Sequence, residues 1–182
     1  MSYKIPVFLS YPKPHLKKQG EFIEKIKVIL DKRGFIGRTL GVTDYDMDEP
    51  LTAIRRLMLE CNGVITIAFR RTYIETGAIK ANSDTDDKPT PIKDKWLTSP
   101  YCHIEPAMAF QIGLPVLIFR EHGVIQDGVL EKGIIGTYLP EFNLEGDMDK
   151  YLNDGEWNQI LGKWEGYVRK VVENKGRPPK LY

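Results

Sequence analysis

The stretch Leu51-Thr-Ala-Ile-Arg-Arg-Leu-Met-Leu-Glu-Cys-Asn-Gly-Val-Ile-Thr-Ile-Ala-Phe69 decides the fold class of this chain. Its first part, residues 51–61, repeats apolar side chains at helical spacing, which predicts an amphipathic helix. The Asn-Gly pair that follows marks a turn, and the apolar run at 64–69 predicts a strand buried on both faces. A helix that leads directly into such a strand is the building unit of a parallel sheet covered by helices.

The same alternation of strands and helices continues on both sides of this stretch. The pattern predicts these further elements: a strand at 5–11, a helix at 21–33, a weaker strand at 35–42, a strand at 114–119 and a final amphipathic helix at 157–172. We therefore expect an α/β fold with a doubly wound, flavodoxin-like sheet. This sheet is mostly parallel, has about five strands and carries helices on both faces.

Two segments lack a clear period. Residues 75–95 are polar and rich in Gly, Pro, Asn and Asp, so we expect a long mobile loop that acts as a lid or a flexible insertion. Residues 123–146 are irregular and rich in glycine, and they are candidates to cover a site. We treat 1–182 as one domain, with a core at about 5–120 and an extension at 121–182 that ends in the last helix.

Bulk composition excludes several classes of function. The 182 residues carry a formal net charge of only +1, which gives no electrostatic reason to expect a nucleic-acid or membrane partner. No apolar run has the length of a signal peptide or a membrane span, so we expect a cytoplasmic location. Cys61 and Cys102 lack Cys-x-x-Cys spacing and are expected to be reduced thiols. The three histidines form no metal-ligand pattern, so we expect neither a metal nor a resident cofactor.

Glu105 is the candidate catalytic residue. It lies in Ser99-Pro-Tyr-Cys-His-Ile-Glu105, among small, aromatic and apolar residues just ahead of the strand at 114–119. A carboxylate buried near a strand-rich core is costly without a partner or a role. It is suited to hold a ribose hydroxyl or to stabilise charge on a sugar whose glycosidic bond is breaking. The alternative is a solvated carboxylate in the first turn of a helix.

The segment around Glu105 and the first strand resemble those of a bacterial Toll/interleukin-1 receptor (TIR) domain. Val7-Phe-Leu-Ser-Tyr11 is similar to the family's opening strand, and Ser99-Pro-Tyr-Cys-x-x-Glu105 resembles its motif Ser-x-Trp-Cys-x-x-Glu. The acidic stretch 44–50 falls where the family has its BB loop. The resemblance covers about residues 5–120. It implies cleavage of NAD by Glu105, through hydrolysis or cyclisation to an ADP-ribose-type signal, in a Thoeris-type antiphage system.

The resemblance also implies the remaining site residues and partners. NAD is then the substrate, and the chain is expected to self-associate or to act with a partner effector protein. Arginine suits pyrophosphate because it binds phosphate bidentately, although arginines after a strand are more often ordinary solvated charges. The candidates for substrate contact are Ser10, Tyr11, Arg38, Asp46, Arg70, Arg71, Ser99 and Tyr101.

The sequence leaves the backbone around Glu105 and the function of the chain open in three respects. Pro106 directly follows Glu105, so a helix that starts at Ser99-Pro100 is expected to kink or to begin anew there. Glu105-Pro-Ala-Met-Ala-Phe-Gln-Ile-Gly-Leu-Pro-Val116 is also similar to nucleoside 2-deoxyribosyltransferases, which share the doubly wound sheet and a catalytic glutamate. A non-catalytic TIR-like module that binds a nucleotide or assembles with other domains is the third possibility.

Overall fold

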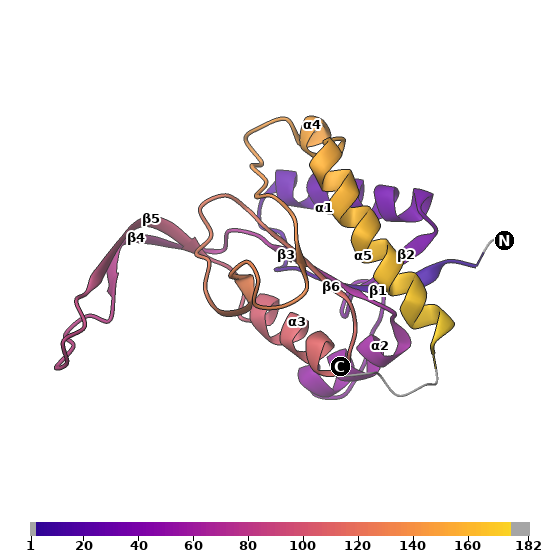
Figure 1. Ribbon diagram of the computed structural model, residues 1–182, viewed down its shortest axis with the longest axis horizontal. Helices are drawn as coiled ribbons and strands as arrows, with labels where there is room; N and C mark the ends of the chain where they lie inside the picture. Colours follow the sequence, from indigo (N-terminus) through magenta and orange to yellow (C-terminus); the bar gives the residue numbers. More distant parts are fainter. Residues whose placement is uncertain (1–2, 176–182) are drawn as a thin grey trace.

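A five-stranded parallel sheet forms the centre of the computed structural model, which describes residues 3–175 (Figure 1). The strand order is β2-β1-β3-β6-β7, and every neighbouring pair is parallel. The strands are β1 (Ile5–Ser10), β2 (Phe35–Arg38), β3 (Val64–Ala68), β6 (Val116–Arg120) and β7 (Thr137–Tyr138). This order confirms the predicted doubly wound, flavodoxin-like fold. The order reverses beside β1, so the switch point where such folds bind ligands lies outside the carboxyl ends of β1 and β3.

Helices cover both faces of the sheet (Figure 1). One face carries α1 (Lys17–Lys32) and α5 (Gly155–Glu173), and the other carries α2 (Pro50–Glu60) and α3 (Tyr101–Gln111). Phe22, Trp157 and Trp164 fill the core under α1 and α5. Phe8, Met58 and Cys102 belong to the separate core under α2 and α3. The two cores explain why β3 and β6 are buried along their whole lengths and read as unbroken apolar runs.

Several predicted boundaries shift by a few residues. β2 ends at Arg38 rather than at 42, because a turn follows in which Gly41 has a φ of 76°. α1 begins before the predicted 21, and β6 begins after Pro115. The other short elements are η1 (Gly128–Leu130) and α4 (Met148–Leu152). The sheet and its cores therefore also use residues beyond 120, while the assignment of 1–182 to one domain stays a prediction.

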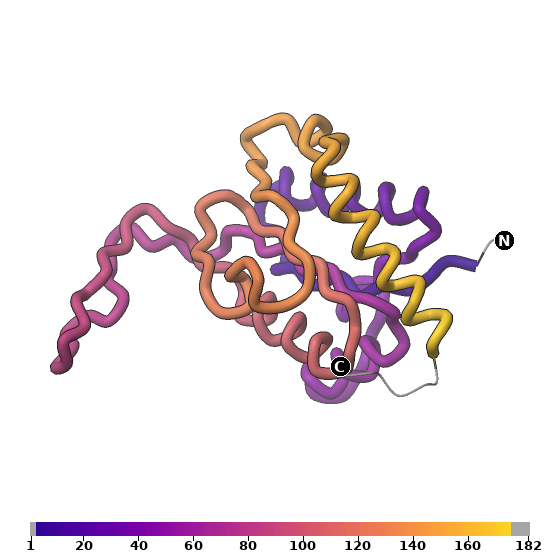
Figure 2. The backbone as a smooth tube through the Cα atoms, in the orientation of Figure 1, coloured from indigo at the N-terminus to yellow at the C-terminus, as the bar shows by residue number. Residues whose placement is uncertain are grey.

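The prediction of a mobile loop at 75–95 is wrong. These residues belong to an antiparallel hairpin of β4 (Thr72–Ile79) and β5 (Thr90–Leu97), which projects away from the sheet (Figures 1 and 2). Its base is joined to the body by backbone hydrogen bonds from Trp96 to Gly123 and from Ile125 to Trp96. The turn-forming residues are concentrated at the tip, so the β-forming residues on either side pair with one another.

Among residues 3–175, no helix has both the length and the apolar character that a membrane crossing requires.

Candidate active site at the carboxyl edge of the sheet

Two buried hydroxyl groups mark the switch point of the sheet. Ser10 is the last residue of β1 and lies in register with Thr66 of β3. Both side chains are at most 1% exposed, and neither hydroxyl has a hydrogen-bond partner among residues 3–175. A buried polar group without a partner costs free energy and is uncommon in native proteins. Two of them in register on neighbouring strands, where this fold class binds ligands, make this edge of the sheet a candidate binding site.

Glu105 lies beside the Ser10 hydroxyl because of how α3 packs. The helix rests on β1 and β3, and the Cys102 thiol on its inner face donates to the backbone oxygen of Ile67, 3.9 Å away. Residues three apart on a helix share a face, so Glu105 points to the same side as Cys102. Glu105 is 8% exposed, which places a carboxyl group in an almost dry position at the carboxyl ends of β1 and β3.

Burial sets the protonation of Glu105. Loss of water raises the pKa of the Glu105 carboxyl to about 7, and the Ser10 hydroxyl acts in the opposite direction. The Ser10 hydroxyl does not have the distance and angles of a full hydrogen bond to either side chain. It is nevertheless near enough to lower the pKa of both Glu105 and Cys102. A carboxyl group with a pKa near neutrality changes charge easily, which is common for residues that take part in catalysis.

Cys102 is not suited to act as a nucleophile. Burial raises the pKa of its thiol to about 12, so the reactive thiolate is scarce near neutral pH. The hydroxyl of Thr98 donates to the Cys102 sulfur at 3.6 Å. Thr98 is itself buried, and sequence reasoning missed it together with Thr66. Thr98 could have been found in the sequence because it directly precedes Ser99-Pro100, where the helix that carries Glu105 is expected to start.

Ser99 holds the start of the helix that carries Glu105. Its hydroxyl accepts a hydrogen bond from the Tyr101 backbone at 3.3 Å, and its backbone oxygen accepts from Cys102 at 2.9 Å. The prediction that a helix starts at Ser99-Pro100 is therefore confirmed. The helix does not begin anew at Pro106 but runs unbroken to Gln111. The buried side of α3 packs on the sheet and offsets the hydrogen bond that proline cannot make.

The two tyrosines among the candidates lie away from the Glu105 carboxyl. Tyr11 is half-buried and packs against the core of the α1–α5 face, which is opposite to α3. Tyr101 is 40% exposed at the first position of α3. The structure therefore brings Ser10 to Glu105, while Ser99 lies at the start of the same helix and both tyrosines lie outside this pair.

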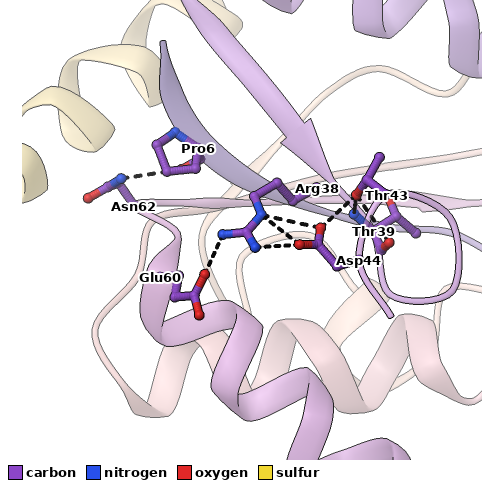
Figure 3. A network of polar contacts seen from close by, with 7 residues as sticks. All are labelled: Pro6, Arg38, Thr39, Thr43, Asp44, Glu60 and Asn62. Carbon is purple, nitrogen blue, oxygen red and sulfur yellow. Dashed lines mark hydrogen bonds and ion pairs between the residues drawn. The ribbon is translucent and has the colours of Figure 1, made fainter. Parts of the chain in front are cut away.

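Arg38 is fully engaged in ion pairs (Figure 3). Its guanidinium group donates to the carboxylates of Asp44 and Glu60, and the hydrogen bond to Asp44 is the main cause that raises the pKa of Arg38. Figure 3 shows how this pairing ties the loop after β2 to the end of α2. Arg38 thus stabilises the acidic loop, and its donors are occupied by protein carboxylates.

Asp46 has a similar structural role on the other side of the acidic loop. Its carboxylate accepts a hydrogen bond from the Asp48 backbone at 3.0 Å and forms an ion pair with Arg56 of α2. The backbone hydrogen bond from Asp48 is the main cause that lowers the pKa of Asp46. The loop is therefore fastened to α2 through Arg38 and Arg56.

Arg70 fastens the base of the hairpin. Its backbone N–H donates to Glu121 at 2.9 Å, its Nε donates to the His122 backbone oxygen at 2.6 Å, and its guanidinium lies 5.8 Å from the Trp96 ring centre. Arg71 is exposed, and its side chain forms no ion pair with residues 3–175. Of the two arginines, only Arg71 has its charged donors unoccupied by these residues.

Within residues 3–175, no three side chains of His, Cys, Asp or Glu come together in a way that could hold a metal ion.

Comparisons with known proteins give distant structural likenesses. No protein-family model matches the chain, and no curated protein matches its sequence. The CMP N-glycosidase BcmB of Clostridium botulinum is 16% identical, with a TM-score of 0.48 over 87% of this chain and 98% of that chain. The TIR domains of the activated Roq1 resistosome, which recognises the effector XopQ, are 13% identical, with a TM-score of 0.40 over 95% and 86%. The flavoenzyme FerB of Paracoccus denitrificans is 9% identical, with a TM-score of 0.38 over 94% and 98%. Likenesses this distant leave the function to be argued from the residues themselves.

Proposed function

We propose that this chain is a TIR-like enzyme that cleaves the bond between nicotinamide and ribose in NAD. Glu105 is the catalytic residue of this proposal. The observation that supports it is the nearly dry Glu105 carboxyl, with a pKa raised to about 7, beside the unpaired hydroxyl of Ser10. A buried carboxyl group and hydroxyl groups without protein partners, placed at a switch point, are suited to form hydrogen bonds with the hydroxyl groups of a ribose.

The chemistry of N-glycosidic cleavage fits a carboxylate in this position. As nicotinamide leaves, positive charge develops on the ribose ring, and a carboxylate stabilises that charge most strongly where water is excluded. Ser10 and Thr66 supply hydroxyl groups that can donate to or accept from ribose hydroxyls. Water gives hydrolysis as the outcome, and an internal nucleophile of the nucleotide gives a cyclic ADP-ribose-type product. A role in antiphage defence is part of the proposal because of the TIR-like motif alone.

The low exposure of Glu105 favours a second candidate function. A carboxyl group that is 8% exposed in the single chain is not open to a substrate as large as NAD. The chain is then either a non-catalytic nucleotide-binding or assembly module, or an enzyme whose site opens on self-association or on contact with a partner effector protein. A test at several protein concentrations distinguishes an enzyme that opens on assembly from a non-catalytic module, because only the enzyme gains activity as the concentration rises.

The experiment compares wild type with Glu105→Ala on NAD at low and high protein concentration. Nicotinamide is measured by chromatography, and Glu24→Ala on the exposed side of α1 is the matched control. The proposal expects release by wild type and by the control, and none by Glu105→Ala. If wild type and both variants are folded and equally inactive at high concentration, the enzyme hypothesis is contradicted and the binding-module hypothesis is supported.

A parallel incubation with a deoxynucleoside and a second free base tests the deoxyribosyltransferase alternative. That alternative predicts exchange of the base, lost in Glu105→Ala, with NAD left intact. The same reaction class and the same carboxylate serve both enzymes, so the choice between them depends on the product alone.

A further inference from the structure

A cavity of about 350 Å³ lies between the β4–β5 hairpin and the loop that follows β6. Strand β5 lines it with Ile92, Lys93 and Lys95, and the body lines it with Arg120 and His122. Neither Ser10 nor Glu105 contributes to its lining, so it is separate from the candidate active site. Its volume is within the range of small-molecule sites in proteins.

The positive charges of this cavity are only partly balanced. Glu141 is the carboxylate of the lining, and both of its oxygens are already engaged, one by the guanidinium of Arg120 and the other by His122 Nδ1 at 3.1 Å. Lys93 and Lys95 form no ion pair with residues 3–175. The cavity therefore keeps two lysine charges that have no protein counter-charge within the described chain.

Arg120 gives the cavity a fixed group of donors. It is 9% exposed at the end of β6, where Val124 and Glu141 accept from its two terminal nitrogens. A guanidinium group carries five N–H donors, so these contacts leave some of them unused. A positioned arginine with flexible lysines close by is a favourable arrangement for phosphate oxygens.

Part of the remaining lining is apolar and suits the base of a nucleotide. Pro91 and Ile92 of the hairpin and Ile125 of the loop lie in the same cavity as the lysines. A planar base packs well against such side chains, while free phosphate or sulfate makes no use of them. We propose that this cavity binds a nucleoside phosphate, with the phosphate at Lys93, Lys95 and Arg120 and the base on the apolar wall.

Occupation of the cavity also stabilises the hairpin. A two-stranded hairpin is marginally stable by itself, and most of the β4 and β5 side chains are exposed. A ligand that contacts β5 on one side and the loop after β6 on the other adds a connection between hairpin and body. Slower amide hydrogen exchange in β4 and β5 is therefore expected when the ligand binds.

The test is calorimetric binding of AMP, pyrophosphate and adenosine to the full chain. The variant is the double change Lys93→Glu and Lys95→Glu. The matched control is Lys163→Glu and Lys170→Glu on the exposed side of α5, which changes the net charge equally.

We expect AMP to bind more tightly than adenosine, and the hairpin variant to lose about tenfold or more in AMP affinity, because charge-assisted contacts are lost. The control is expected to bind as wild type does. Hydrogen exchange in the hairpin is expected to slow with AMP in wild type and in the control, but not in the hairpin variant.

Three results overturn the proposal. The first is no binding of AMP or pyrophosphate at millimolar concentration. The second is an equal loss in the hairpin variant and the control, which indicates unspecific attraction. The third is AMP binding that Glu105→Gln removes and the hairpin variant keeps, because AMP then lies at Glu105. This last result leaves the proposed function intact, so the two proposals fail separately.

Discussion

Glu105 and Glu121 are both buried glutamates near the carboxyl edge of one sheet, at 8% and 3% exposure, yet their surroundings differ. Burial raises the pKa of both carboxyl groups. Glu121 accepts a hydrogen bond from the Arg70 backbone at 2.9 Å and has the Arg70 guanidinium 3.7 Å away. Glu105 has only the hydroxyl of Ser10 to lower its pKa.

The difference separates a structural carboxylate from a candidate for chemistry. The partners of Glu121 offset the loss of water and join the end of β3 to the hairpin base and the loop after β6. The Glu105 carboxyl has no such compensation, so the fold bears its cost without a gain in stability. Such sites are commonly retained for function.

The largest expected effect is on catalysis. Glu105→Gln keeps the shape of the side chain and removes its charge, so nicotinamide release should fall by about 100-fold or more, the size seen when a transition-state charge loses its stabilising group. The same change at Glu121 should leave nicotinamide release near the wild-type level, because Glu121 touches no part of the proposed site. Initial rates at saturating NAD measure both. Equal losses in the two variants would remove the functional distinction between the two glutamates.

The second effect is on stability as a function of pH. The pKa of the Glu105 carboxyl is about 7 in the folded chain, compared with 4.5 when the group is exposed to water in the unfolded chain. Folding therefore favours the protonated form of Glu105. The stability of the folded chain that depends on a protonated Glu105 is fully present below pH 4.5, and it is lost as the pH rises from 4.5 through about 7. A shift of that size corresponds to about 3 kcal/mol. Wild type should therefore lose stability relative to Glu105→Gln over this interval, measured by urea unfolding at a series of pH values.

Parallel stability curves for wild type and Glu105→Gln would show that the carboxyl group is solvated in solution, contrary to the buried position described here.

The third effect concerns the partners of Glu121. Glu121→Ala leaves the partly buried backbone N–H of Arg70 without its acceptor, so the free energy of unfolding should fall by about 1 kcal/mol. Glu121→Gln retains an oxygen that can accept this hydrogen bond and should lose less. Thermal unfolding of both variants checks the order. A stability of Glu121→Ala equal to that of wild type would mean that Glu121 is as uncompensated as Glu105.

The smallest effect is on the pH profile of the reaction. The active form of Glu105 is the carboxylate, so kcat/KM for NAD should rise as the pH passes through about 7 and then level off. The hydroxyl of Ser10 lowers the pKa of Glu105, so Ser10→Ala should move the midpoint to higher pH. A profile that falls with pH in the same interval would assign Glu105 the role of an acid instead.

The sequence predicts the sheet well because its strands are parallel and buried on both faces. β3 and β6 are buried strands that appear as apolar runs in the sequence, and α2 begins at Pro50, one residue before the helix predicted at 51–61. The hairpin was missed because the polar residues of its tip dominate the composition of 75–95, while the strand-forming residues flank them.

The chemistry of single charged residues was harder to predict. Sequence reasoning could identify Glu105 through its motif, but it could not show that Arg38 and Arg70 are occupied by Asp44 and Glu121. Glu121 is 51 residues from Arg70 in the sequence, and Asp44 reaches Arg38 across a turn of six residues, so both pairings depend on the folded structure. The contrast between Glu105 and Glu121 likewise exists only in three dimensions, since both are glutamates next to apolar segments.

The most direct test of the role of Glu105 is a structure of the assembled protein with an NAD analogue that resists cleavage. We expect the Glu105 carboxylate to lie within about 2.6–3.2 Å of a ribose hydroxyl on the nicotinamide side. We also expect the Ser10 hydroxyl to gain a hydrogen-bond partner. A ribose bound elsewhere, with Glu105 still covered and Ser10 still unpaired, would contradict this role of Glu105.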